Sequence, residues 1–127
     1  VEPLPNGIRV QLVDDLKQKI FTKRNSSELS IFTQKFLDLI ASIITQTDFK
    51  IFASAHSQKF KTQAGDSFSV WDLTAERALN IYRYLIEKGT NPENIANISA
   101  HGDYQLYIPE EPHSLQNNRI SLELKLL

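Results

Sequence analysis

The last residues of the chain carry the pattern that most restricts its fold. Ile120, Leu122, Leu124 and Leu126 are apolar, and the residues between them are polar. A period of two is typical of a β-strand that buries one face and exposes the other. Similar alternation predicts three more strands, over residues 8–13, 49–56 and 95–100. Strands with one apolar face need a covering layer, so this pattern predicts a sheet with further elements packed against it.

Two segments have the three-and-four spacing of a helix with one apolar face. Ser30 is placed to cap the first, whose apolar residues are Ile31, Phe32, Phe36, Ile40, Ile43 and Ile44. We expect Thr74 to cap the second, whose apolar residues are Ala75, Ala78, Leu79, Tyr82, Leu85 and Ile86, and Gly89 to end it. The predicted order is strand, helix, strand, helix, strand, strand. This order indicates one α/β-type domain in which helices cover a single sheet.

The length of 127 residues fits a single domain over residues 1–127. Pro3 and Pro5 predict an extended, turn-like segment over residues 1–7. The chain starts at Val1, which we interpret as a sign of a processed or excised piece with an upstream anchor.

Composition excludes several classes of function. The net charge is −1 and no basic run with interleaved aromatic residues occurs, so we expect no nucleic-acid binding. The chain has no cysteine, which excludes disulfides, thiolate zinc sites and a cysteine nucleophile. No apolar stretch approaches the ~20 residues that a membrane-spanning helix needs, so this chain is not expected to insert into a membrane.

Arg77 is the first candidate for a binding residue. If Thr74 caps the second helix, Arg77 stands at about the third helical position, where the free backbone N–H groups are already positive. A cation gains nothing there from the helix itself, but together with the helix end it can hold an anion. The alternative is a weak, solvated ion pair of Arg77 with Asp72 or Glu76.

Four segments, in order along the chain, resemble a known family. They are Asn6–Asp15 with Ile20-Phe21 and Ser26–Leu29, then Ala55-His56-Ser57, then Trp71–Ala78, and finally Asn117-Asn118-Arg119-Ile120. The second stands where the family has Gly-His-Thr, the third matches aromatic-acidic-Leu-Ser-x-x-Arg-Ala, and the fourth is similar to Asn-Arg-Arg-Val. The chain thus resembles the OmpA-like family of periplasmic cell-wall-binding domains, in particular the MotB-type C-terminal domains of flagellar stators.

The resemblance implies an α/β fold of the α+β sandwich type, ordered β-α-β-α-β-β. About four strands form a mixed sheet, with two main helices on one side. It also implies a non-catalytic domain without cofactor or metal that binds the diaminopimelate of peptidoglycan stem peptides. The implied ligand-binding residues are His56, Ser57, Gln58, Asp72, Thr74, Arg77, Asn117 and Arg119.

The same resemblance places the domain in the periplasm of a Gram-negative bacterium, with its parent protein anchored to the inner or outer membrane. It implies a homodimer and protein partners in an envelope complex. Arg77 matches the family arginine that takes the ligand carboxylate.

Several positions depart from the family pattern. Gln58 stands where the family has an acid, Ala55 and Ala100 replace glycines, and Asn118 replaces an arginine. Losing a charge-assisted hydrogen bond costs about 1–2 kcal/mol of binding free energy. Asp66 or Asp72 could supply the missing acid. Two functions therefore stay open: a peptidoglycan anchor of a machine such as a motor stator, and a degenerate domain that has lost wall binding and serves as a structural part, for instance of a secretion system.

Catalytic and metal sites find little support in the sequence. His56, His101 and His113 lack the spacing of a metal-binding motif. Ser57, His101 and Asp103 could imitate a hydrolytic triad, but no nucleophile-elbow sequence surrounds Ser57. We therefore expect no enzymatic activity.

Overall fold

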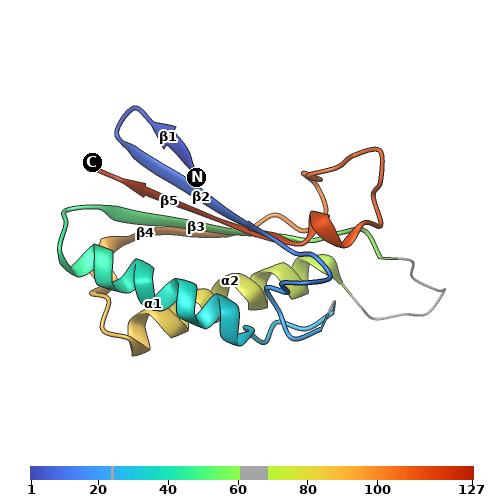
Figure 1. The fold of residues 1–127 in the computed structure, drawn as a ribbon, viewed down its shortest axis with the longest axis horizontal. Helices are drawn as coiled ribbons and strands as arrows, with labels where there is room; N and C mark the ends of the chain where they lie inside the picture. Colours follow the sequence, from blue (N-terminus) through green and yellow to red (C-terminus); the bar gives the residue numbers. More distant parts are fainter. Residues whose placement is uncertain (24, 61–68) are drawn as a thin grey trace.

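A single mixed sheet forms one layer of the protein and two helices form the other. The computed structural model describes residues 1–23, 25–60 and 69–127. In these residues the strands are β1 (Glu2–Leu4), β2 (Gly7–Val13), β3 (Lys50–His56), β4 (Ile95–Ala100) and β5 (Arg119–Lys125), arranged in the order β1-β2-β5-β3-β4. Helices α1 (Ile31–Thr45) and α2 (Val70–Glu87) both lie on one side of the sheet (Figure 1). The α/β fold with two helices on one side is confirmed.

The sheet has one strand more than the resemblance implied. β3 and β4 are parallel, and all the other pairs are antiparallel. The additional strand is β1, which lies in the segment predicted to be merely extended and pairs Glu2 with Arg9 and Leu4 with Gly7. Pro3 is tolerated there because β1 is an edge strand.

Apolar side chains from both layers form the core between them. Of the apolar residues expected on the helices, Ile40, Ile44, Ala78 and Leu85 are buried, whereas Ile31 and Leu79 are exposed. α1 contributes Leu37, Ile40, Ala41 and Ile44, α2 contributes Ala78, Ile81 and Leu85, and the sheet contributes Ile51, Ala53, Ala55, Ile120, Leu122 and Leu124. The period-two pattern is confirmed for Ile120, Leu122 and Leu124, which are buried, while the residues between them are more exposed. Leu126, expected to continue the apolar face, lies beyond β5 and is half exposed.

The predicted N-cap residue is confirmed for α1 and wrong for α2. Ser30 caps α1 as expected, and its side chain accepts a hydrogen bond from the Thr33 amide. The expected cap of α2 at Thr74 is wrong, because the helix begins at Val70 and Ser69 is its N-cap. Ser69 offers the same hydroxyl acceptor five residues earlier, and it accepts hydrogen bonds from the amides of Trp71 and Asp72.

Short turns complete the connections. The C-cap of α2 is Lys88, and Gly89 follows it. The backbone φ of Gly89 is 97°, a value that residues with a side chain rarely adopt. The 3₁₀ turn η1 (Pro92–Asn94) leads into β4, and η2 (Leu115–Asn117) leads into β5. No helix in the described part of the chain is long and apolar enough to cross a membrane.

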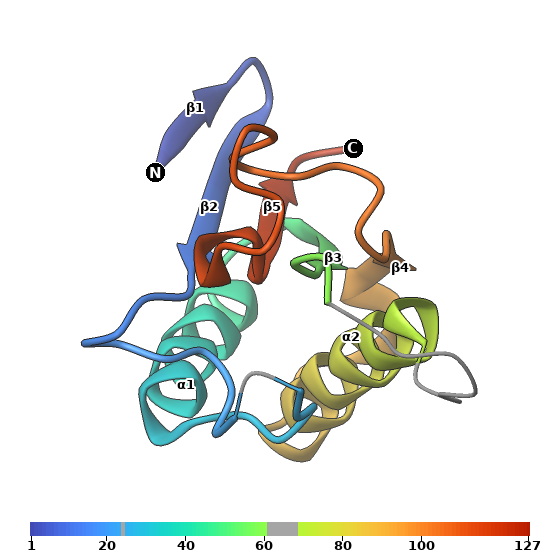
Figure 2. The ribbon, with the colours of Figure 1, turned by 90° about the vertical axis from the view of Figure 1, so that its right-hand side faces the viewer.

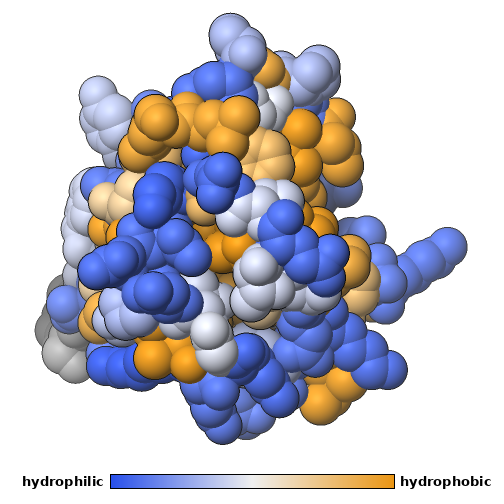
Figure 3. Space-filling view, turned by 90° about the vertical axis from the view of Figure 1, so that its left-hand side faces the viewer, coloured by the Kyte–Doolittle hydropathy of each residue, from blue (hydrophilic) through white to orange (hydrophobic). Residues whose placement is uncertain are grey.

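The two ends of the molecule differ in what they carry. At one end, on the right in Figure 1 and facing the reader in Figure 2, β2 and β3 finish, β5 starts, and the N-termini of both helices lie below them. The opposite end carries both chain termini, and hydrophilic residues cover much of it, with separate apolar patches between them (Figure 3). The predicted site residues belong to the first end.

Candidate functional site

Buried polar side chains gather where β2 and β3 finish and β5 starts. The members are Asp14, Ser57, Gln58, Thr74, Arg77, Asn117 and Asn118, each less than 4% exposed. Several of them come directly after or before a strand, and α2 supplies Thr74 and Arg77 from below the sheet. Burying polar groups is costly unless they are hydrogen-bonded, so the contacts of this cluster decide what it can do.

Arg77 is the central member of the cluster and has no exposed surface. Its Nε donates a hydrogen bond to the Ser26 carbonyl oxygen (2.9 Å), and its Nη1 donates to Asn118 Oδ1 (3.2 Å). The guanidinium carbon lies 4.0 Å from the centre of the Phe21 ring, a cation–π contact. Arg77 is thus a buried cation held on several sides.

The position of Arg77 along α2 corrects the expectation from sequence. Because α2 starts at Val70, Arg77 is the eighth residue of the helix and lies beyond its first two turns. The helix end does not help it to attract an anion, since that effect is confined to the first turn. Its expected alternative, a solvated ion pair with Asp72 or Glu76, is also wrong, because Arg77 is fully buried and Glu76 faces Arg83 instead.

Gln58 and Asn118 form a closed pair beside Arg77. Asn118 Oδ1 accepts hydrogen bonds from the backbone N–H of Gln58 (3.0 Å) and from Arg77. Asn118 Nδ2 donates a hydrogen bond to the side-chain oxygen Oε1 of Gln58 (2.8 Å). The side-chain nitrogen Nε2 of Gln58 donates a hydrogen bond to the His113 carbonyl oxygen (3.0 Å). Both polar ends of Gln58 are therefore occupied by the protein itself.

Asp14, which was not among the expected site residues, is the acidic side chain whose charge acts on Arg77. Burial raises the pKa of Asp14, although the Ile20 N–H, the Arg77 charge and Asn118 act in the opposite direction. Burial likewise lowers the pKa of Arg77 to about 10, and the charge of Asp14 offsets part of this. Asp66 lies outside the described residues.

The strand pairing explains why Asp14 belongs to this cluster. Asp14 follows β2 as Gln58 follows β3, and both strands run antiparallel to β5. Their final residues therefore meet at the same end of the sheet, next to Asn118.

Three further predicted site residues hold the local backbone in place. Thr74 Oγ1 accepts a hydrogen bond from the Gly102 amide (3.0 Å), and Ser57 donates one to the Gln58 carbonyl oxygen (2.8 Å). Asn117 accepts from the Ile108 amide (2.7 Å) and donates to the Glu111 carbonyl oxygen (2.8 Å). The Thr74 bond ties the segment between β4 and β5 to α2, the Asn117 bonds hold that segment together, and the Ser57 bond lies within the turn after β3.

Asp72 is exposed in the first turn of α2, where its charge favours the helix N-terminus.

Strand geometry separates His56 and Arg119 from this cluster. Ile120 faces the core, so Asn118 lies on the helix side of the sheet while Arg119 lies on the opposite side. His56 pairs with Arg119 in register on that same side, where both line a hollow in the sheet. The eight predicted ligand residues are therefore not brought together in one site.

The described residues contain no cluster of His, Cys, Asp or Glu that could hold a metal ion. The imagined triad is also not assembled among them, because Ser57 donates to a carbonyl oxygen and Asp103 pairs with Lys59 (3.5 Å).

Comparison with known proteins agrees with this architecture. The model of the OmpA family matches residues 21–119. A putative flagellar export/assembly protein, LafU, from Escherichia coli O44:H18 is 29% identical over 122 residues, which are 96% of this chain and 39% of that protein. A putative truncated LafU from Escherichia coli K12 is also 29% identical, over 96% of this chain and 57% of its own length. The chain thus spans less than two thirds of either relative.

Solved structures share the fold. The periplasmic domain of Helicobacter pylori MotB superposes with a TM-score of 0.77 at 21% identity, covering 98% of this chain and 79% of that one. A putative MotB-like protein from Desulfovibrio vulgaris superposes with a TM-score of 0.75 at 16% identity, covering 94% and 75%. The family model spans most of the sequence, and its fold is the one observed. The chain belongs to the OmpA family, a family of non-catalytic domains.

Proposed function

We propose that this chain is a peptidoglycan-binding domain that acts in the periplasm as part of an envelope machine of the flagellar-stator type. Membership of the OmpA family and the fold shared with MotB periplasmic domains support this proposal. The relatives named as flagellar export/assembly proteins point to the same kind of machine. The homodimer and the membrane-anchored parent expected from the family resemblance stay predictions.

The observation that carries the proposal is the fixed, buried charge of Arg77. The family motif supplies this arginine, and the backbone of Ser26, the amide of Asn118 and the Phe21 ring hold it in one orientation. A preorganised guanidinium is suited to a carboxylate of a stem peptide, because a charge-assisted hydrogen bond is about twice as strong as a neutral one. Since Arg77 is fully covered, the ligand carboxylate has to displace part of this cover.

A second function is favoured by the closure of the same site. Gln58 replaces the family acid, and both polar ends of its side chain are bonded within the protein. A domain with a closed site could serve as a structural part of an envelope complex without binding the wall. The two functions differ in whether the domain is retained by peptidoglycan.

Sedimentation with purified peptidoglycan separates the two. We expect the wild-type chain to cosediment with diaminopimelate-type peptidoglycan and only weakly with lysine-type peptidoglycan. Arg77→Gln removes a charge-assisted bond worth about 1.5–3 kcal/mol, so its retention should fall about tenfold or more. Arg83→Gln makes the same charge change on the exposed face of α2 and should be retained as well as the wild type.

A Gln58→Asp variant tests whether the replaced acid limits affinity. It should bind diaminopimelate-type peptidoglycan more tightly than the wild type, because it restores a negative partner for the ligand ammonium. If neither the wild type nor Gln58→Asp is retained above the background of a peptidoglycan-free control, the structural function replaces the proposed one. Circular dichroism of Arg77→Gln distinguishes lost binding from lost folding.

A further inference from the structure

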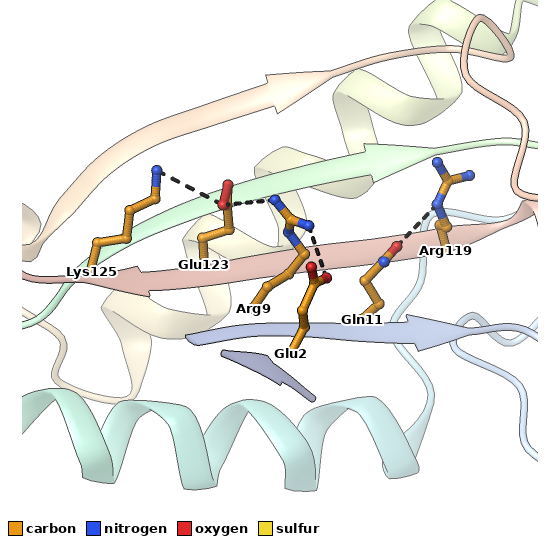
Figure 4. A network of polar contacts seen from close by, with 6 residues as sticks. All are labelled: Glu2, Arg9, Gln11, Arg119, Glu123 and Lys125. Carbon is orange, nitrogen blue, oxygen red and sulfur yellow. Dashed lines mark hydrogen bonds and ion pairs between the residues drawn. The ribbon is translucent and has the colours of Figure 1, made fainter. Parts of the chain in front are cut away.

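The face of the sheet turned away from the helices holds a hollow of about 390 Å³. We call it the open-face hollow; Gln11, Ser54, His56, His101, Arg119 and Ser121 are among its lining residues. It lies on the opposite side of β5 from Arg77 and Asn118 and so is separate from the site discussed above. Figure 4 shows the charged and polar side chains that rise from the strands on this face.

The charges in the hollow fall into two groups. In the first, Arg9 is bonded to Glu2 (2.9 Å) and Glu123 (3.3 Å), and Lys125 lies 3.8 Å from Glu123, so these charges balance one another. Arg119 stands apart at the other end of the row (Figure 4). Glu123 is four residues away along β5, ~13 Å at the usual strand rise, too far to neutralise Arg119.

One N–H donor group of Arg119, Nη1, has no hydrogen-bond partner among the described residues. Its Nε donates to Gln11 Oε1 (3.2 Å), and its guanidinium lies 5.7 Å from the Tyr107 ring, both neutral groups. Nη1 is buried, and in the part of the chain that the structure describes it has no hydrogen-bond partner and Arg119 has no ion pair. The residue is 8% exposed, so water does not readily replace the missing partner.

His56 offers a second unmatched group beside the first. It lies directly opposite Arg119 on the neighbouring strand, is 6% exposed, and its Nδ1 has no hydrogen-bond partner among the described residues. Its ring stacks on His101 with centroids 4.5 Å apart. Burial, followed by the charges of Arg119 and His101, lowers the pKa of His56 to about 3, so at neutral pH it adds a polar atom but no charge.

This arrangement selects a particular kind of ligand. One uncompensated positive charge matches one negative charge, and a second negative charge at Arg119 would have no further cation to pair with, because Arg9 and Lys125 are already bonded to acids. A planar guanidinium pairs best with a planar carboxylate. The serine hydroxyls that line the hollow can form hydrogen bonds with polar groups on the rest of the ligand. We propose that the open-face hollow binds a carboxylate monoanion through Arg119 and His56.

Acetate is the simplest probe. In the ¹⁵N-labelled chain we expect the Arg119 Nε–H and His56 ring resonances to shift and saturate in the millimolar range as acetate replaces chloride at constant ionic strength. Acetamide, which has the same shape without the charge, should cause no saturating shift, and sulfate should bind more weakly than acetate. Equal responses to acetate and acetamide, no saturation, or tighter binding of sulfate would each overturn the proposal.

A pair of variants locates the site. Arg119→Gln should weaken acetate binding about tenfold or more, whereas Arg83→Gln, the same charge change on the helix side of the molecule, should not alter it. Unchanged affinity in a folded Arg119→Gln variant would overturn the assignment. If Arg119→Gln does not fold, the comparison of acetate with acetamide on the wild type decides. Peptidoglycan takes no part in this experiment, so its result is independent of the proposed function.

Discussion

Two buried arginines near the same strand end have different surroundings. Arg77 is covered completely and held by the Ser26 carbonyl, Asn118 and a ring, with Asp14 nearby. Arg119 lies on the other side of the sheet, with one donor left unmatched among the described residues. The sequence motif grouped Asn117, Asn118 and Arg119 because they are adjacent. Strand alternation places Arg119 on the opposite side from Asn118, and this separation follows from the period-two pattern that starts at Ile120.

His56 is the residue through which acid should act on stability. Its pKa falls from an ordinary 6.5 to about 3 on folding. Between these values the unfolded chain binds a proton that the folded chain does not, so the free energy of unfolding decreases as pH falls, by ~1.4 kcal/mol per unit. Above pH 6.5 His56 has no such effect.

Urea unfolding at pH 6.5 and 5.0 checks this prediction. Over this interval the wild type should lose about 2 kcal/mol more stability than His56→Gln, which cannot take up the proton. His113→Gln, which removes an exposed histidine instead, serves as the matched control. Parallel losses in the wild type and His56→Gln would show that His56 is not the group responsible.

At the scale of elements, the periodic spacing of apolar residues predicted most of the helices and strands. α1 begins after Ser30 as expected, and β3, β4 and β5 lie within a residue or two of the predicted segments. The start of α2 was misplaced because two hydroxyl residues could serve as caps, and the apolar pattern begins only after Thr74. The cap hydrogen bonds that Ser69 accepts from the Trp71 and Asp72 amides and the burial of Leu73 place the helix start at Val70. β1 was missed because a three-residue edge strand with a proline has almost no periodic signal.

The two hydroxyls of α2 should therefore respond differently to substitution. Ser69→Ala should lower the free energy of unfolding by ~1 kcal/mol, whereas Ser69→Asp should retain it, because a carboxylate also caps and favours the helix N-terminus. Hydrogen exchange of the Trp71 and Asp72 amides, which donate to Ser69, should accelerate in Ser69→Ala. Unchanged exchange and stability in Ser69→Ala would return the cap to another residue.

The site was harder to predict than the elements because it depends on strand order. Of the residues that the family motifs pointed to, Arg77 and Gln58 lie together, joined through Asn118. The sequence reasoning did not find Asp14, because nothing local states that β2 and β3 both neighbour β5.

At the scale of the whole molecule, contacts distant in sequence join the two ends of the chain. β2 pairs with β5 along its full length. Beyond that pairing the Leu126 N–H donates a hydrogen bond to the Asn6 carbonyl oxygen (2.9 Å). The core cluster draws on both helices and on strands from both halves of the sequence. The strands of the first half therefore have no complete core until those of the second half are in place.

We therefore predict a single unfolding transition, which is the result expected if residues 1–127 form a single domain. The chain has one tryptophan, Trp71, which lies in the first turn of α2 against Gly102 and so reports on the site end of the molecule. Far-ultraviolet circular dichroism reports on both helices. In urea the two signals should have the same midpoint, because the first turn of α2 is joined to the core through Thr74 and the Gly102 amide. An earlier midpoint for fluorescence would mean that the site end opens separately from the core, and the single-domain prediction would then fail.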